Sequence, residues 1–344
     1  MRTDDFDYEL PTGSIAQSPA EPRDSCRLLV LDRQSGQRDH RTFADLPEYL
    51  REGDLLVVNE TRVLPARLTG VKDETGGAVE LLLLRERYDN AWECLVKPGR
   101  RLKPGAKVVL GGGLMTGLIV ETLDAGGGRL VQFTPHEGTL LDVVHRIGSM
   151  PLPPYITKPL EDPDSYQTMF ATTERSAAAP TAGLHFTPGL LDRCRAAGAR
   201  VETIELDVGL DTFRPVSEDD PEKHPIHTEH FRVTEQAARA VNRTKEQGGR
   251  VIAVGTTSVR ALESAWDHES DSLCVKDAAT SLYILPGYRF GAVDAMITNF
   301  HVPRSTLLML VSAFAGRENM LSAYEEALRV GYRFLSFGDA MLIL

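Results

Sequence analysis

Hydroxyl groups and free backbone amides gather where a predicted strand passes into a predicted helix at residues 254–260 (VGTTSVR). This segment offers backbone N–H groups and the side chains of Thr256, Thr257 and Ser258. Ligands of α/β proteins bind at such junctions, beside the carboxyl ends of strands. The segment lacks the lysine of a GxxxxGK[ST] loop, so it does not imply a nucleotide phosphate. An ordinary helix cap is the alternative interpretation.

Two further segments carry histidines. The small residues within 178–187 (AAPTAGLHFT) let the backbone approach a ligand. His185 in this segment can serve as a general acid or base, or it can form an ordinary structural hydrogen bond. Residues 224–230 (HPIHTEH) resemble a metal site, but the proline excludes the helical HExxH spacing. We therefore predict no metal. We expect His227 and Glu229 to enter a cleft for proton transfer or contact with a cation, with a solvated loop as the alternative.

Residues 297–303 (ITNFHVP) end a predicted strand with an amide, an aromatic ring and an imidazole. Asn299 and His301 can hydrogen-bond to a planar heterocycle, whereas packing of Phe300 in the core would explain the ring equally well. No GxSxG motif, Ser/His/Asp spacing or paired-cysteine nucleophile occurs in the chain. Covalent hydrolase chemistry is therefore disfavoured.

The elements that must position these segments alternate between helices and strands. Helices are predicted at residues 43–50, 188–197, 234–247, 258–266, 305–314 and 322–330, and strands at residues 55–58, 201–206, 250–254, 281–285 and 295–298. Alternation of this kind predicts an α/β fold, here a mixed sheet flanked by helices.

A different pattern fills the region from about residue 65 to residue 150, where short β-type runs are separated by glycine-rich turns. The runs cover residues 78–84, 92–97, 107–110, 118–121 and 130–134. This spacing predicts a small antiparallel β-barrel. We therefore predict a discontinuous α/β catalytic domain of residues 1–62 and 151–344, and an inserted β-barrel domain of residues 63–150.

Composition and charge limit the binding partners and the cellular compartment that can be expected. Among the 344 residues, 38 Lys and Arg face 49 Asp and Glu, so the net charge of −11 argues mildly against nucleic acid. However, residues 61–110 hold ten basic residues against six acidic ones, which leaves a local basic surface. The four cysteines are too widely spaced for a metal knuckle or a compact disulfide framework. With no secretion signal and no membrane-length apolar run, we expect a soluble cytoplasmic protein.

Taken in order, these segments resemble the S-adenosylmethionine:tRNA ribosyltransferase-isomerase family of queuosine biosynthesis. The matching stretches run from end to end. They are residues 8–11 (YELP) with 23–24, 53–67 (GDLLVVNETRVLPAR), 150–156 (MPLPPYI), 166–168, 179–187, 253–260, 298–316 (TNFHVPRSTLLMLVSAFAG) and 332–343 (YRFLSFGDAMLI). Eight collinear stretches of this length are highly specific.

The resemblance implies a reaction in which the ribosyl group of S-adenosylmethionine moves to 7-aminomethyl-7-deazaguanine in the anticodon of tRNA. Adenine and methionine leave, and the sugar is isomerised to give epoxyqueuosine. The resemblance also implies an α/β domain interrupted by a β-barrel. We expect S-adenosylmethionine as co-substrate, no other cofactor, no membrane partner and a monomeric chain.

We hypothesise roles for individual residues within these segments. Proton transfer is assigned to His185, His227 and Glu229. Binding of the methionine, adenosine or base portions is assigned to Thr181, Gly183, Thr256, Thr257, Ser258, Arg260, Asn299 and His301. Binding of tRNA phosphates is assigned to Arg62, Arg67, Lys97, Arg100, Arg101, Lys103 and Lys107, for which a solvated barrel surface is the alternative.

The chain departs from the family pattern at three places. It reads Asp207 and Asp211 in DVGLDTF where the family usually reads HVGxGTF, and Arg175 where the family usually has glycine. Asp207 and Asp211 motivate a second hypothesis, a divergent relative that binds S-adenosylmethionine or a nucleoside without the isomerisation. A non-catalytic RNA-binding module is a third, and release of adenine and methionine would discriminate among them.

Overall fold

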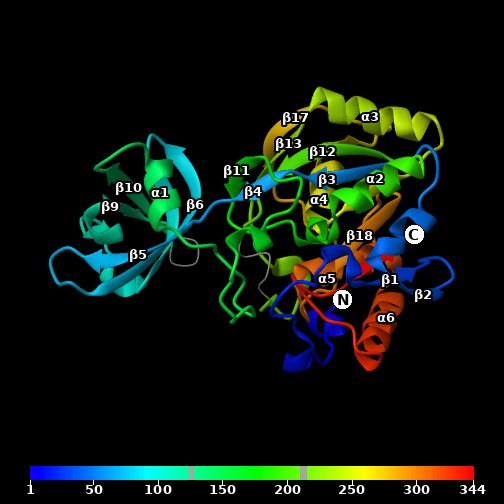
Figure 1. Ribbon diagram of the computed structural model, residues 1–344, viewed down its shortest axis with the longest axis horizontal. Coiled ribbons are helices and arrows are strands. Elements are labelled where there is room, and N and C mark those ends of the chain that lie inside the picture. The colour runs from blue at the N-terminus through cyan, green and yellow to red at the C-terminus, as the bar shows by residue number, and fades with distance from the viewer. Residues whose placement is uncertain (124–127, 210–214) are drawn as a thin grey trace. The chain divides into compact units, whose positions relative to one another are not determined.

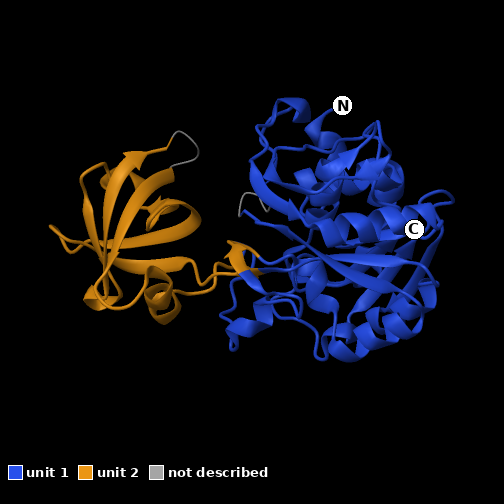
Figure 2. Cartoon of the chain, turned by 90° about the horizontal axis from the view of Figure 1, so that it is seen from above, with its two compact units in different colours: residues 1–61, 153–173, 179–344 blue, residues 62–152, 174–178 orange. Residues whose placement is uncertain are grey.

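The computed structural model describes residues 1–123, 128–209 and 215–344. The chain divides into two compact units (Figure 2). The first unit consists of residues 1–61, 153–173 and 179–344, and the second of residues 62–152 and 174–178. Residues 174–178 thus belong to the second unit, although they lie within the range that the sequence assigns to the α/β domain.

A nine-stranded mixed sheet forms the centre of the first unit (Figure 1). In spatial order its strands are β17 (Lys276–Thr280), β13 (Glu229–Val233), β12 (Arg200–Leu206), β3 (Leu55–Asn59), β14 (Val251–Val254), β18 (Ala295–Asn299), β19 (Ala340–Ile343), β1 (Arg27–Leu31) and β2 (Arg38–Thr42). β12, β3, β14 and β18 run parallel to one another, whereas the outer strands include antiparallel pairs. β3 and β14 are buried along their whole length, as expected for parallel strands covered on both faces. The predicted α/β class is confirmed.

Helices follow several of these strands in the chain. They are α2 (Pro188–Ala196), α3 (Glu235–Glu246), α4 (Thr256–Ala265), α5 (Thr306–Ala315) and α6 (Arg317–Arg329). α2 begins as predicted, with the Thr187 hydroxyl accepting the Leu190 N–H at 3.2 Å. Its Leu190 and Leu191 pack with Leu56 and Val58 of β3 in one apolar cluster. This core holds the sheet rigid, so polar residues just beyond β14 and β18 have fixed positions.

Three predicted elements differ from the observed ones. Residues 43–50 form a 3₁₀ helix (Phe43–Tyr49) and not an α-helix, because Pro47 lacks the N–H that an α-helix interior requires. The strand predicted at 281–285 is wrong, since the outermost strand is the polar segment Lys276–Thr280 paired with β13. An edge strand needs no continuous apolar run, which explains the misplacement. α6 begins at Arg317, before the apolar periodicity becomes visible in the sequence.

The second unit is a closed six-stranded antiparallel barrel. Its strands, in spatial order, are β10 (Gly128–Pro135), β7 (Ala91–Lys97), β6 (Ala78–Tyr88), β5 (Arg67–Lys72), β8 (Lys107–Leu110) and β9 (Met115–Thr122). The predicted barrel is confirmed, but β5 was not among the predicted strands. Its Gly70 interrupts the β pattern, and a Cβ there would lie only 2.2 Å from the Val109 carbonyl oxygen. Close approach of the neighbouring strand therefore requires this glycine.

Three smaller features complete the fold. α1 (Leu140–Ile147) begins at Thr139, whose hydroxyl accepts the Asp142 N–H. Two short ribbons are formed by β4 (Thr61–Val63) with β11 (Thr173–Ser176), and by β15 (Trp266–Asp267) with β16 (Ser272–Leu273). Within the described ranges, no helix combines the length and the apolar character needed to cross a bilayer.

Candidate active site

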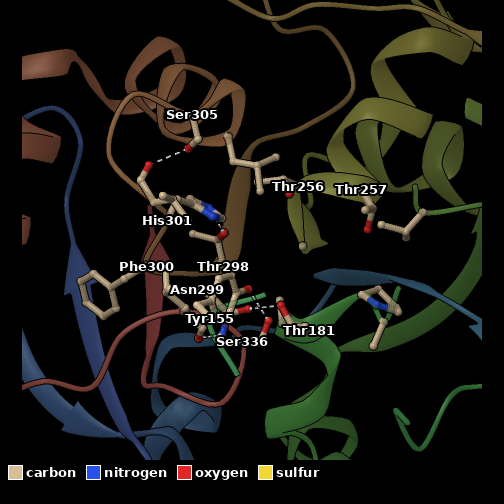
Figure 3. A pocket seen from close by; sticks show the side chains of 18 residues that line it. Tyr155, Thr181, Thr256, Thr257, Thr298, Asn299, Phe300, His301, Ser305 and Ser336 are labelled. Carbon is tan, nitrogen blue, oxygen red and sulfur yellow. Dashed lines mark hydrogen bonds between the residues drawn. The ribbon is translucent and has the colours of Figure 1, made fainter. Parts of the chain in front are cut away.

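A pocket at the carboxyl ends of β14 and β18 in the first unit encloses about 550 Å³, open solvent included (Figure 3). The side chains that can hydrogen-bond from its lining are Tyr155, Thr181, Thr256, Thr257, Thr298, Asn299, His301, Ser305 and Ser336. These residues come from segments far apart in the chain. Folding of the sheet therefore brings polar residues from separate segments together around one cavity.

Five residues predicted to bind the substrate line this cavity, namely Thr181, Thr256, Thr257, Asn299 and His301. Ser258 and Gly183 do not. The Ser258 hydroxyl is buried and donates to the Val254 carbonyl oxygen at 2.8 Å. Gly183 lies against Thr168, and a Cβ at Gly183 would be 3.0 Å from the Thr168 methyl carbon. The structure therefore assigns these two a local packing position outside the cavity wall.

The amide of Asn299 connects the cavity to the layer behind it. Asn299 Oδ1 accepts from the Thr181 hydroxyl at 2.9 Å, and Asn299 Nδ2 donates to the Leu335 carbonyl oxygen at 3.3 Å and to His185 Nε2 at 3.0 Å. Because His185 Nε2 accepts, its proton lies on Nδ1, which is 3.2 Å from Cys26 Sγ. His185 thus fixes the orientation of the Asn299 amide.

His185 itself does not belong to the lining of this cavity. Its ring packs against Phe43, with centroids 5.1 Å apart. Burial, with a smaller contribution from the positive charges of Arg23 and Arg333, lowers the pKa of His185 to about 3. A neutral imidazole with both nitrogens engaged is poorly placed to take a proton from a substrate. This geometry argues against the predicted proton-transfer role of His185 and favours a positioning role.

His301 differs from His185 because it lines the cavity. Its Nε2 lies 2.9 Å from the Thr298 hydroxyl, and its backbone N–H donates to the Tyr324 hydroxyl at 3.0 Å. Burial lowers the pKa of His301 to about 3, so the imidazole is neutral at pH 7. A neutral ring held in this way can hydrogen-bond to a nucleobase, as expected from the sequence, but it is a weak base.

These two neutral histidines predict a pH-dependent stability. An unfolded histidine binds a proton below its ordinary pKa of 6.5, whereas the folded chain resists protonation of His185 and His301 until about pH 3. Stability is therefore complete above pH 6.5 and falls as the pH drops through that window. We expect each histidine to lower the free energy of unfolding by about 2 kcal/mol between pH 7 and pH 5. Urea unfolding of the unchanged chain and of His301→Gln at both pH values tests this, and equal losses in the two proteins would contradict it.

A second buried cluster joins His227, Glu229 and Arg260. The Arg260 guanidinium forms an ion pair with Glu229 Oε2, and Glu229 Oε1 accepts from His227 Nε2 and from the Gly209 N–H, both at 2.9 Å. Burial alone would raise the pKa of Glu229, but Arg260 and these donors lower it by more, so its pKa is below the ordinary value. The carboxylate therefore stays ionised and holds the half-buried imidazole of His227 in one orientation.

None of these three side chains lines the cavity. Residues 208 and 209 connect the cavity with the cluster. Val208 lines the cavity, and a Cβ at Gly209 would lie 3.6 Å from atoms of both Glu229 and His227. Within the described part of the chain, no group of three or more His, Cys, Asp or Glu side chains could hold a metal ion.

Comparison with known proteins matches residues 3–343 to the family described as queuosine biosynthesis protein. The chain belongs to the queuosine biosynthesis protein family. Relatives from Symbiobacterium thermophilum and Desulfitobacterium hafniense are each 54% identical over 344 residues, which covers 100% of both chains. Both are named S-adenosylmethionine:tRNA ribosyltransferase-isomerase. A crystal structure of S-adenosylmethionine tRNA ribosyltransferase from Thermotoga maritima is 36% identical, with a TM-score of 0.56, and covers 99% of this chain and 100% of that one.

Asp207 occupies the position at which a histidine is expected in this family. The Asp207 carboxylate lies 3.8 Å from Nδ1 of His230 on the neighbouring strand, and Nε2 of that histidine is 2.7 Å from Asp277. An imidazole is therefore present beside the carboxylate at this position. Asp211 lies outside the described residues, and Arg175 is part of β11 in the second unit.

The predicted tRNA-binding cations all lie in the second unit. Two of them have acidic partners, since Arg62 is 3.5 Å from Glu174 and Arg67 is 2.7 Å from Glu80. The other five are exposed, and among the described residues they form no ion pair; they are Lys97, Arg100, Arg101, Lys103 and Lys107. These five fall within eleven consecutive residues and form an exposed basic segment.

Sequence reasoning missed four of the polar residues that line the cavity, namely Tyr155, Thr298, Ser305 and Ser336. Tyr155 and Ser336 have their hydroxyl oxygens 2.8 Å apart, and Ser305 caps α5 by accepting the Leu308 N–H. Tyr155 and Ser336 belong to the stretches 150–156 and 332–343 that match the queuosine biosynthesis protein family. Family resemblance was therefore the signal that could have found them, because neither follows a predicted strand or precedes a predicted helix.

Proposed function

We propose that this chain transfers the ribosyl group of S-adenosylmethionine to 7-aminomethyl-7-deazaguanine in the anticodon of tRNA and isomerises it to epoxyqueuosine, with release of adenine and methionine. The observation that carries the proposal is the full-length identity of 54% with relatives named for this transfer and isomerisation. The cavity supports it, because hydroxyl, amide and neutral imidazole groups suit an adenosyl group and a nucleobase.

The reaction sets requirements that the described residues can meet. Hydrogens beside the sulfonium are acidic and need a base, the departing adenine needs a proton, and the attacking amine must be neutral. We assign the base to His227, with its imidazole oriented by Glu229, whose charge is balanced by Arg260. Thr181, Thr256, Thr257 and Asn299 hold the co-substrate, and His301 contacts a nucleobase.

The test is incubation of the chain with S-adenosylmethionine and tRNA that carries the aminomethyl base. We expect adenine and methionine to appear in equal amounts, together with epoxyqueuosine in the tRNA. Binding of S-adenosylmethionine without either product would favour the divergent relative suggested by Asp207. Binding of tRNA alone would favour an RNA-binding module and would contradict the proposed reaction.

We further propose that the exposed cations of the second unit bind tRNA. Reversing the charge of Arg100, Arg101 and Lys103 should weaken tRNA binding about ten- to a hundredfold and reduce the salt dependence by roughly 2 to 3 in log–log slope. Filter binding at several salt concentrations measures both quantities.

A matched variant separates this local effect from the change in net charge. Reversal of Lys223, Arg195 and Arg239, which are exposed residues of the first unit, changes the net charge by the same amount. We expect this variant to keep most of its tRNA affinity. Equal weakening in the two variants would show that no local tRNA surface exists in residues 97–107.

We also propose that the protein works as a monomer in the cytoplasm. The four cysteines are free thiols, as a reducing compartment favours. Sedimentation of the purified chain with and without tRNA tests the monomeric state.

A further inference from the structure

The first turn of α4 lies at the cavity without a side chain to cap it. Gly255 occupies the N-cap position with φ of 93°, and it offers no side-chain hydrogen bond to the turn that follows. The first hydrogen bond along the helix is donated by the Val259 N–H to the Gly255 carbonyl oxygen at 3.2 Å. The N–H groups of Thr256, Thr257 and Ser258 precede that bond and have no acceptor within the helix.

The Thr257 hydroxyl is a second, independent feature of the same place. Thr257 is 8% exposed and lines the cavity (Figure 3), yet its Oγ1 is buried with no hydrogen-bond partner among the described residues. A Cβ at Gly255 would lie 3.4 Å from this oxygen, so the hydroxyl sits beside the uncapped turn. A buried hydroxyl without a partner is unfavourable, which indicates that a ligand completes the site.

The charge of the surroundings determines what kind of ligand fits. A helix N-terminus carries a partial positive charge and favours an anion. No Asp, Glu, Lys or Arg is among the described residues that line the cavity, and its one histidine, His301, is neutral. No side chain of the lining therefore neutralises the helix end or repels an anion. A small anionic group that accepts several hydrogen bonds fits this position.

We infer that the first turn of α4, together with the Thr257 hydroxyl, binds the α-carboxylate of the methionine portion of the co-substrate. This inference rests on the proposed function, because the carboxylate is the anionic group of S-adenosylmethionine. Backbone N–H groups and one hydroxyl donate to its oxygens, and the methionine end is thereby fixed at β14. The adenosine end then lies elsewhere in the cavity.

The test pairs a substitution with a change in the ligand. Thr257→Val removes the hydroxyl and keeps the shape, and the probes are S-adenosylmethionine and an analogue in which hydrogen replaces the carboxylate. For S-adenosylmethionine we expect binding to weaken about ten- to a hundredfold, as for a hydrogen bond to a charged group. For the analogue we expect the same affinity in the variant and the unchanged chain. Titration calorimetry measures both.

A control variant and the thermal midpoint exclude a structural explanation. Thr168→Val makes the same change at another buried threonine whose hydroxyl lacks a partner, but Thr168 does not line the cavity. It should leave both affinities unchanged. The thermal midpoint of ligand-free Thr257→Val should be unchanged or higher, because an unsatisfied hydroxyl is removed.

Two results would overturn the inference. One is equal weakening for both ligands, which would assign the hydroxyl to another part of the co-substrate. The other is unchanged affinity for both. Adenine release by the unchanged chain, measured in parallel, tests the proposed function separately: its absence would overturn that function, whereas loss of the Thr257 effect would overturn only the carboxylate site. Failure of the unchanged chain to bind S-adenosylmethionine would overturn both.

Discussion

Glu229→Leu is expected to lower the free energy of unfolding of the first unit by about 3–5 kcal/mol, because it leaves the Arg260 guanidinium buried without its ion-pair partner. This is a large part of the roughly 5–15 kcal/mol that stabilises a typical domain. Urea unfolding followed by Trp266 fluorescence in a Trp92→Phe background measures the change in this unit alone. Trp92 and Trp266 are the two tryptophans of the chain, and Trp92 lies in the second unit.

The double substitution Glu229→Leu with Arg260→Met separates stability from catalysis. Removing both charges should recover most of the lost stability, since a buried ion pair contributes little net free energy. Recovery is incomplete because the Gly209 N–H and His227 lose their acceptor. Turnover should not recover, because His227 is no longer oriented. Recovery of turnover together with stability would make Glu229 a structural residue only.

An exposed ion pair provides the matched control for this cycle. Glu235 and Arg239 of α3 lie 2.8 Å apart, with both side chains about 70% exposed. Glu235→Leu should change the free energy of unfolding by about 1 kcal/mol or less. A loss as large as that of Glu229→Leu would show that burial does not determine the effect.

The fold was largely predictable because its signals are local. Continuous apolar runs such as Leu55–Val58 identify buried parallel strands, and glycine-rich turns identify the barrel. Five strands of the sheet were not predicted: the apolar β1 and β19, together with β2, β13 and β17. The polar edge strand Lys276–Thr280 is defined by its pairing with β13, and β5 needs Gly70 for a close strand approach. Both depend on neighbours distant in sequence.

The candidate site was predictable only in part, for a related reason. Residues at the ends of β14 and β18 reach the cavity because parallel strands end at a common edge. The direction of a side chain in an irregular turn depends on tertiary packing instead. The sequence therefore suggested a catalytic role for His185. In the structure its side chain contacts Phe43, Cys26 and Asn299 and does not line the cavity.

His227→Gln is expected to reduce adenine release by roughly 10²- to 10⁴-fold, the usual contribution of a general base. The reason is that His227 is a half-buried imidazole held by an ionised carboxylate, whereas His185 is only 4% exposed. Exchange of deuterium from C5′ of the ribosyl group should disappear in the same variant. Affinity for S-adenosylmethionine should change little, because a general base acts on the proton in the transition state and contributes little to binding of the ground state.

His185→Gln is the comparison that decides between the two histidines. It disturbs the Asn299 amide, so co-substrate affinity should weaken while C5′ exchange continues once the co-substrate is saturating. The pKa of His185 is about 3, and both of its ring nitrogens already have hydrogen-bond partners. The ring therefore cannot readily accept a proton from the substrate at pH 7. Loss of exchange in His185→Gln with normal exchange in His227→Gln would reverse the assignment and make His185 the base.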